Sequence, residues 1–87
     1  MYEVEITPEG LRHLNRLPEK VREAALAAVF GPIASNPQQL GKPLLGELEG
    51  LRSARRGDYR IIYEIVEPDR VVLIHWIQHR RDVYRPR

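Results

Sequence analysis

Hydrophobic and polar residues follow two different periods at the start of the chain. Residues 2–6 alternate between apolar and polar, which predicts a short half-buried strand. Thr7 and Pro8 are typical of a helix start, because threonine caps free backbone N–H groups and proline fits the first helical turn. Leucines then keep a helical spacing up to Leu17, and Pro18 ends this first helix because proline breaks a helix interior.

A second helix, rich in alanine, is expected from Glu19 onward. Its apolar side comprises Val21, Ala25, Ala28 and Val29. Gly31 and Pro32 interrupt or kink this helix, and the pair Asn36-Pro37 closes it. Two helices joined at a proline predict a helical hairpin.

Glycine and proline are frequent over residues 37–50, which indicates a loop with one extended turn near Leu44 and Leu45. The period of two then returns. Residues 51–56 are predicted to form a short strand that turns at Gly57 and Asp58.

The next strand, residues 59–66, sorts its side chains onto two faces. One face carries Tyr59, Ile61, Tyr63 and Ile65, and the other carries Arg60, Ile62, Glu64 and Val66. A turn over residues 67–70 leads to residues 71–77, which are nearly all apolar and predict a central strand covered on both faces.

The order of these elements predicts an α+β fold, a single domain over residues 1–87. Two N-terminal helices pack on one face of a small, mostly antiparallel sheet, and the first strand docks against the last three. The other sheet face is left free. The alternation of residues 59–66 places Arg60 and Glu64 on that free face.

Composition excludes several kinds of chemistry. The chain has no cysteine, so disulfides, thiolate metal sites and cysteine nucleophiles are excluded. Ser35 and Ser53 are not part of a nucleophilic triad pattern, and there is no glycine-rich phosphate loop. The start of the chain does not resemble a signal peptide, and no apolar run is long enough for a membrane helix. We therefore expect a soluble, cytoplasmic protein without a membrane partner.

The histidines do not form a metal site. His75 and His79 are four residues apart, but in a strand this spacing does not bring two ligands together as it does on a helix. His75 shares parity with Val71, Leu73 and Ile77, so it is expected to be a core or subcore histidine. We expect neither a metal nor another cofactor.

Positive charge is concentrated in the second half of the chain. Residues 1–49 hold five Lys/Arg and seven Asp/Glu, a net charge of −2, whereas residues 50–87 hold nine arginines and five Asp/Glu, a net charge of +4. Arginine grips phosphate and carboxylate groups through two parallel hydrogen bonds. The pattern therefore favours a nucleic acid or an acidic protein as partner, and the alternative is a solvated, salt-bridged surface.

Several candidate residues cluster in the strands and the end of this basic half: Arg55, Arg60, His79, Arg80, Arg81 and Tyr84. Such a set can cleave RNA without a metal. The 2′-hydroxyl attacks the adjacent phosphate, cations stabilise the phosphorane, and a base and an acid move the protons. Arginine is a poor base, so His79 is the natural proton carrier, and Tyr84 can stack on a base or transfer a proton. The alternative is that the arginines pair structurally with Asp58, Glu64 and Asp82.

Two segments resemble the signature stretches of RelE-family toxins, within the RelE/ParE superfamily. Residues 50–63 carry a basic strand followed by Gly57-Asp58-Tyr59-Arg60, and the chain continues to His79-Arg80-Arg81-Asp82-Val83-Tyr84. Gly41-Lys42-Pro43-Leu44 also resembles the usual loop of the family. The similarity covers nearly the whole chain in the right order.

The resemblance implies the toxin of a bacterial type II toxin–antitoxin system, an mRNA endonuclease that acts in the ribosomal A site without metal. Its partners are then the ribosome, mRNA and a cognate RelB-like antitoxin that neutralises it in a hetero-oligomer. Arg60 matches the phosphate-contacting arginine of the family, Arg80 its late arginine, and Tyr84 its C-terminal tyrosine. Arg55 matches a basic strand position, and His79 fits members that use histidine there.

One position departs from the family pattern. Many active members carry Lys or Arg two residues before Arg55, where this chain has Ser53. Arg52 is adjacent, but alternation points it to the other face unless a bulge intervenes. Trp76 shares parity with Arg80, which suggests the free face. We take Arg52, Arg55, Arg81 and Trp76 as candidate RNA-binding residues, with simple packing under the tail as the alternative for Trp76.

Two other functions stay open for the chain. One is a ParE-like inhibitor that binds DNA gyrase and has no nuclease activity. The other is a degenerate toxin that only binds its antitoxin, which Ser53 favours. The joint presence of Arg60, Arg80 and Tyr84 favours the endonuclease.

Overall fold

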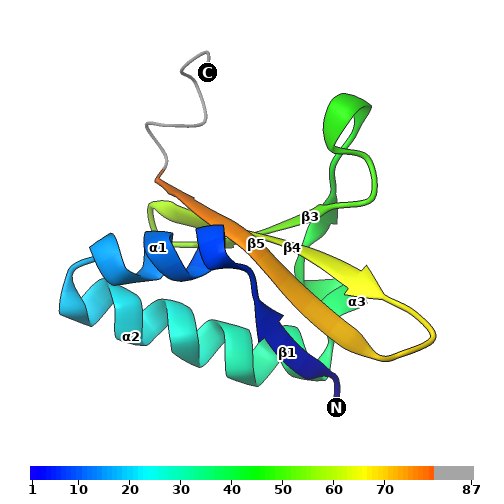
Figure 1. The fold of residues 1–87 in the computed structure, drawn as a ribbon, viewed down its shortest axis with the longest axis horizontal. Coiled ribbons are helices and arrows are strands. Elements are labelled where there is room, and N and C mark those ends of the chain that lie inside the picture. The colour runs from blue at the N-terminus through cyan, green and yellow to red at the C-terminus, as the bar shows by residue number, and fades with distance from the viewer. Residues whose placement is uncertain (80–87) are drawn as a thin grey trace.

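The computed structural model describes residues 1–79 (Figure 1). Its helices and strands follow in the order β1 (Glu3–Ile6), α1 (Pro8–Arg16), α2 (Glu19–Ala28), α3 (Pro37–Leu40), β2 (Lys42–Pro43), β3 (Arg52–Arg56), β4 (Tyr59–Val66) and β5 (Val71–His79). The strands form one sheet in the order β1-β5-β4-β3-β2. β1 runs parallel to β5, and the other neighbours are antiparallel. The predicted α+β class and the docking of the first strand are confirmed.

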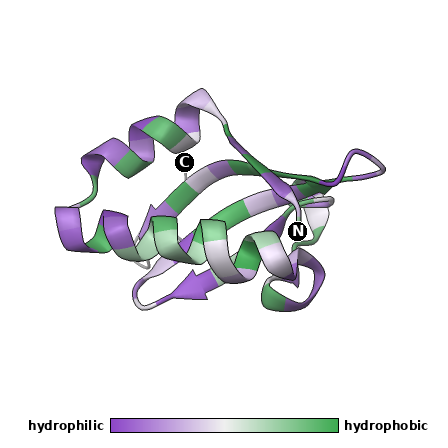
Figure 2. Cartoon of the chain, turned by 90° about the horizontal axis from the view of Figure 1, so that it is seen from below, coloured by the Kyte–Doolittle hydropathy of each residue, from purple (hydrophilic) through white to green (hydrophobic). Residues whose placement is uncertain are grey.

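The helices α1 and α2 cover one face of the sheet, where α1 packs on β5 and α2 on β3 (Figure 1). We call the sheet face away from these helices the open face. Hydrophobic and hydrophilic residues alternate along both helices, as expected for helices with one buried side (Figure 2). No helix within residues 1–79 is long and apolar enough to span a membrane.

The start of α1 is capped as its sequence predicts. The Thr7 hydroxyl accepts a hydrogen bond from the Gly10 amide at 3.0 Å and donates one to the His75 carbonyl at 2.8 Å. Pro8 occupies the first helical turn. Thr7 therefore satisfies a free N–H of the helix and ties α1 to β5 at the same time.

Pro32 does not end the second helix. The chain continues from α2 into a π-helical segment, Val29–Ile33, in which the Ala34 amide donates to the Val29 carbonyl five residues back. Proline offers no N–H and its ring clashes with the carbonyl four residues earlier in an α-helix. The wider turn accommodates Pro32, and the helical direction is kept until Asn36.

The core lies between the helices and the sheet. Ile61 and Tyr63 of β4 are fully buried there, and Tyr59 and Ile65 pack against its edge, so the predicted inner face of β4 is confirmed. β3 adds Ala54, and the helices add Leu14, Ala25, Ala28 and Val29. Of the leucines at helical spacing in α1, Leu14 is buried, whereas Leu11 is 51% exposed.

The segment between the helices and β3 is more ordered than its glycine and proline content predicts. Its extended residues are Lys42 and Pro43, which pair with Ser53 and Arg52, rather than Leu44 and Leu45. Pro37–Leu40 forms the short helix α3. Long-range contacts from the sheet decide this local structure.

The buried Tyr63 anchors the segment. Its hydroxyl donates to the Pro37 carbonyl at 2.6 Å. Gly41 packs directly on the same ring, because a Cβ at this position would lie 2.5 Å from the Tyr63 hydroxyl oxygen. Only glycine allows this close approach. The backbone on both sides of α3 is therefore held against β4.

A bulge in β5 reverses the sheet face to which the side chains after it point. Ile62 pairs with Trp76 and Tyr63 with Ile74, which leaves His75 as an extra residue. Ile77 thus joins Ile74 in the core, and the predicted grouping of Ile77 with His75 is wrong. His75 is a half-buried residue of the open face, where its Nε2 lies 2.9 Å from Glu64 Oε1.

Candidate functional site

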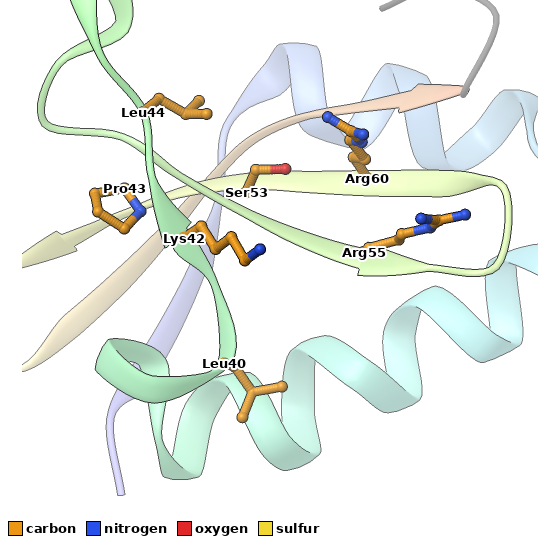
Figure 3. Close-up of a pocket in the computed structure, with 7 residues that line it drawn as sticks. All are labelled: Leu40, Lys42, Pro43, Leu44, Ser53, Arg55 and Arg60. Carbon is orange, nitrogen blue, oxygen red and sulfur yellow. The ribbon is translucent and has the colours of Figure 1, made fainter.

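A pocket of about 470 Å³ opens on the open face beside strands β2, β3 and β4 (Figure 3). Its lining comprises Leu40, Lys42, Pro43, Leu44, Ser53, Arg55 and Arg60. Three of these residues are basic and none is acidic. The pocket therefore brings together positive charge from three neighbouring strands.

Strand pairing sets the positions of the basic residues. Arg55 on β3 lies directly opposite Arg60 on β4, and Lys42 on β2 lies directly opposite Ser53. β4 is paired on both sides, so Arg60 stands on a backbone held by two neighbouring strands. The predicted association of Arg55 and Arg60 on one face follows directly from this register.

These cations have few partners within residues 1–79. The side chains of Arg60 and Lys42 form neither an ion pair nor a hydrogen bond there, and the Arg55 side chain only donates from Nε to the Gly57 carbonyl at 3.3 Å. Two like charges directly opposite each other in a sheet are destabilising. An anion bound in the pocket would offset this repulsion, so the pocket is suited to a phosphate or a carboxylate.

Glu64 does not neutralise Arg60. The nearest partner of the Glu64 carboxylate is His75, and the Glu64 side chain is 41% exposed. The alternative in which Arg60 pairs with Glu64 therefore has no contact in this structure to support it.

Arg52 lies on the helix-covered face, as strand alternation predicts in the absence of a bulge in β3. Its guanidinium donates to the carbonyls of Gln38 and Gly41, at 2.5 and 2.6 Å. This side chain braces the segment around α3 and does not line the pocket. The structure therefore does not bring Arg52 together with the other predicted RNA-binding residues.

His79 is separated from Arg60 by the sheet. Its ring meets the Tyr59 ring edge-on, with 4.8 Å between the ring centroids, and the two residues are paired across the strands. Tyr59 faces the helices, so Arg60, the next residue on β4, points to the opposite side. The geometry does not support His79 as the proton carrier beside Arg60.

Trp76 lies opposite Ile62 on the open face, as its parity suggests, and is half-buried. Its ring centroid lies 6.2 Å from that of His75. Arg80, Arg81 and Tyr84 lie outside the described residues, so their predicted roles stay predictions.

Sequence reasoning missed Lys42. The segment Gly41-Lys42-Pro43-Leu44 resembles the family loop, and the signal for Lys42 is the proline that follows it. Proline restricts the preceding residue to extended backbone, and such a residue can extend a sheet edge. This pairing carries Lys42 into the pocket.

A metal site is not part of this arrangement. Within the part of the chain that the structure describes, there is no group of three or more His, Cys, Asp or Glu residues that could hold a metal ion. The charge available to an anion at this pocket is that of lysine and arginine.

Comparison with known proteins places the chain in a family. Residues 4–84 match the family described as ParE toxin of type II toxin-antitoxin system, parDE. The chain is 53% identical to Toxin RelE of Mycobacterium tuberculosis over 85 residues, covering 97% of this chain and 87% of the relative. It is 40% identical to Toxin RelG of the same organism over 84 residues, covering 97% of each.

Solved structures agree with this placement. The toxin–antitoxin complex RelBE2 from M. tuberculosis contains a chain that matches with a TM-score of 0.87 at 39% identity, over 91% of this chain and 98% of that one. The isolated E. coli RelE toxin shares the fold, with a TM-score of 0.76 at 17% identity, over 91% of this chain and 84% of that one. The chain belongs to the RelE/ParE superfamily and is a RelE/RelG-like toxin of a type II toxin–antitoxin system.

Proposed function

We propose that this toxin is a metal-independent, ribosome-dependent endoribonuclease that cleaves mRNA and thereby inhibits translation. The observation that carries the proposal is the pair Arg55 and Arg60, directly opposite each other in a pocket without an acidic lining residue. Such a pocket suits the phosphodiester backbone of RNA, which offers one negative charge per nucleotide. The similarity to toxins named RelE and RelG supports the same assignment.

The chemistry follows from what guanidinium groups can do. In the proposed reaction the 2′-hydroxyl oxygen forms a bond to the adjacent phosphorus, and the bond from phosphorus to the leaving 5′-oxygen breaks. Negative charge builds on the non-bridging oxygens, where Arg60 and Arg55 stabilise it through charge-assisted hydrogen bonds. Arginine stays protonated at every physiological pH, so it cannot take the 2′-hydroxyl proton.

Another group must accept the 2′-hydroxyl proton, and a proton must be delivered to the leaving 5′-oxygen. Because His79 faces Tyr59 on the other side of the sheet, we assign this role to the end of the chain, where Tyr84 is the predicted candidate and Arg80 a further cation. A tyrosine can also stack on an unpaired base and so orient the scissile phosphate.

The proposed partners follow from the same assignment. The structural relatives include toxin–antitoxin complexes, RelBE2 and the intact E. coli RelBE complex. We infer that a RelB-like antitoxin neutralises this toxin in a hetero-oligomer, and that the free toxin acts on mRNA in the ribosome, in the cytoplasm.

Primer extension on mRNA from cells that express the toxin tests the proposal. We expect discrete cleavage sites inside translated regions, and none when translation initiation is blocked. Cleavage by the purified toxin on programmed ribosomes should persist after divalent ions are chelated under conditions that leave ribosomes intact. Growth inhibition without mRNA cleavage would contradict the proposal.

A second candidate function is inhibition of DNA gyrase. The observation that favours it is the match of residues 4–84 to the family described as ParE toxin of type II toxin-antitoxin system, parDE. A supercoiling assay run beside primer extension separates the two functions. Loss of gyrase supercoiling with intact mRNA would favour the inhibitor.

A further inference from the structure

We propose that Lys42 supplies, from the neighbouring strand, the positive charge that Ser53 does not provide, and that its ammonium contacts the RNA phosphate next to Arg55 and Arg60. This inference rests on the proposed nuclease function and names a further substrate-binding residue for it. Neither the resemblance nor the comparisons assign a role to this lysine.

The inference rests on the register between strands β2 and β3. Lys42 on β2 and Ser53 on β3 are direct cross-strand partners, so their Cβ atoms lie on the same face, roughly 4.5–5.5 Å apart. A lysine side chain is long enough to extend across that spacing. Figure 3 shows the Lys42 side chain extending from β2 in the direction of Arg55, and Ser53 and Arg60 line the same pocket.

The small size of Ser53 makes room for this arrangement. A basic side chain at this position would extend into the same pocket as Lys42 and would place a like charge directly opposite it. Serine removes both conflicts. With serine at this position, the pocket still contains three basic residues, and one of them is Lys42 from the neighbouring strand.

The backbone of Lys42 is held on both sides. Pro43 restricts Lys42 to extended backbone, and proline is tolerated because β2 is the edge strand. On the other side Gly41 packs on the Tyr63 ring, and its carbonyl accepts a hydrogen bond from Arg52 at 2.6 Å. A cation on a backbone held in this way loses less conformational entropy when it binds a phosphate.

Lys42 is also available for binding. Lys42 is exposed, and its side chain forms no ion pair or hydrogen bond within residues 1–79. A lysine acts on phosphate as a point charge that tolerates several orientations. We therefore assign Lys42 to a non-bridging oxygen, and the directional contacts to the two arginines.

A charge exchange between the two strands tests the inference. Lys42→Ser should lower the rate of mRNA cleavage on programmed ribosomes by roughly 10- to 100-fold, less than a fully preorganised donor contributes. The exchanged double variant, Lys42→Ser with Ser53→Lys, should recover most of the activity. Lys42→Arg should stay within a few-fold of wild type, because it keeps the charge.

Lys20→Ser is the matched control, because Lys20 is an exposed lysine on α2, away from the pocket. It should leave cleavage unchanged. All variants should keep the wild-type melting temperature and antitoxin affinity.

Wild-type cleavage by Lys42→Ser overturns the inference and leaves the nuclease proposal standing. A loss of cleavage together with a lowered melting temperature, or one that neither the exchange nor Lys42→Arg restores, also overturns it. A wild-type protein that does not cleave mRNA overturns both proposals.

Discussion

Two arginines of the same strand have different roles, because one lies on each face of the sheet. Arg52 and Arg55 are both in β3, three residues apart, and therefore point to opposite sides. Arg52 faces the helices and donates two hydrogen bonds to backbone carbonyls. Arg55 faces the pocket, opposite a second arginine. The sheet face on which an arginine lies decides its role here, and the residue type alone does not predict that role.

The two faces also differ in how their polar groups are satisfied. On the helix-covered face, Tyr63 is fully buried and its hydroxyl has a partner at 2.6 Å. On the open face, the charged side-chain groups of Lys42 and Arg60 have no hydrogen-bond or ion-pair partner within residues 1–79. One face thus stabilises the fold, and the other keeps charge available for an anion. Substitutions on each face should separate stability from activity.

The largest effect is expected for Arg60→Ala. A rigidly placed cation contributes most when negative charge builds in the transition state, so mRNA cleavage should fall by roughly 10²–10³-fold. Arg60→Lys should recover only part of the activity, because lysine cannot grip two oxygens at once. Melting temperature and antitoxin affinity should stay at wild-type values. An Arg60→Ala protein that cleaves at the wild-type rate would remove Arg60 from the site.

Gly41→Ala should act on stability. The added Cβ would lie 2.5 Å from the Tyr63 hydroxyl oxygen, so the core must shift, at a cost of about 1–3 kcal/mol. Gly31→Ala is the matched control, because a Cβ there meets nothing within 4 Å. Urea unfolding of both variants measures the difference. Equal unfolding free energies for the two variants would show that Tyr63 does not anchor this segment.

Tyr63→Phe removes the hydroxyl and leaves the Pro37 carbonyl without its donor. We expect a loss of about 1–2 kcal/mol in unfolding free energy. Tyr59→Phe should change stability less, because the Tyr59 hydroxyl donates no hydrogen bond within residues 1–79. The prediction fails if both variants unfold at the same denaturant concentration.

Glu64→Ala should have the smallest effect. It removes the carboxylate beside His75, a partly exposed pair that contributes about 0–1 kcal/mol. Because Glu64 does not contact Arg60, cleavage should stay near the wild-type rate. A large change in cleavage with Glu64→Ala would mean that Glu64 influences the pocket although it lines none of it and pairs with His75.

Local alternation in the sequence was enough to predict the layout of β4. Ile61 and Tyr63 were expected inside and Arg60 outside, and the structure confirms both. The cap at Thr7 was also predictable, because it depends only on the residues next to it.

Lys42, the role of Arg52 and the place of His75 could not be predicted in this way. Lys42 reaches the pocket because β2 pairs with β3, and Arg52 finds its two carbonyl partners in a segment 11–14 residues away. His75 lies where a bulge shifts the register between β4 and β5. Each of these depends on contacts between distant segments.

The sequence by itself determined the period of each element, the helix cap, and the face on which Arg55 and Arg60 lie, because these properties are set by side-chain alternation and by neighbouring residues. The tertiary structure decided which strands are neighbours, and through them which cations share a pocket. It also decided the shift in β5 that places Ile77 and His79 toward the helices. One extra residue in a strand reverses the facing of all that follow, and only packing against the core selects where that residue is accommodated.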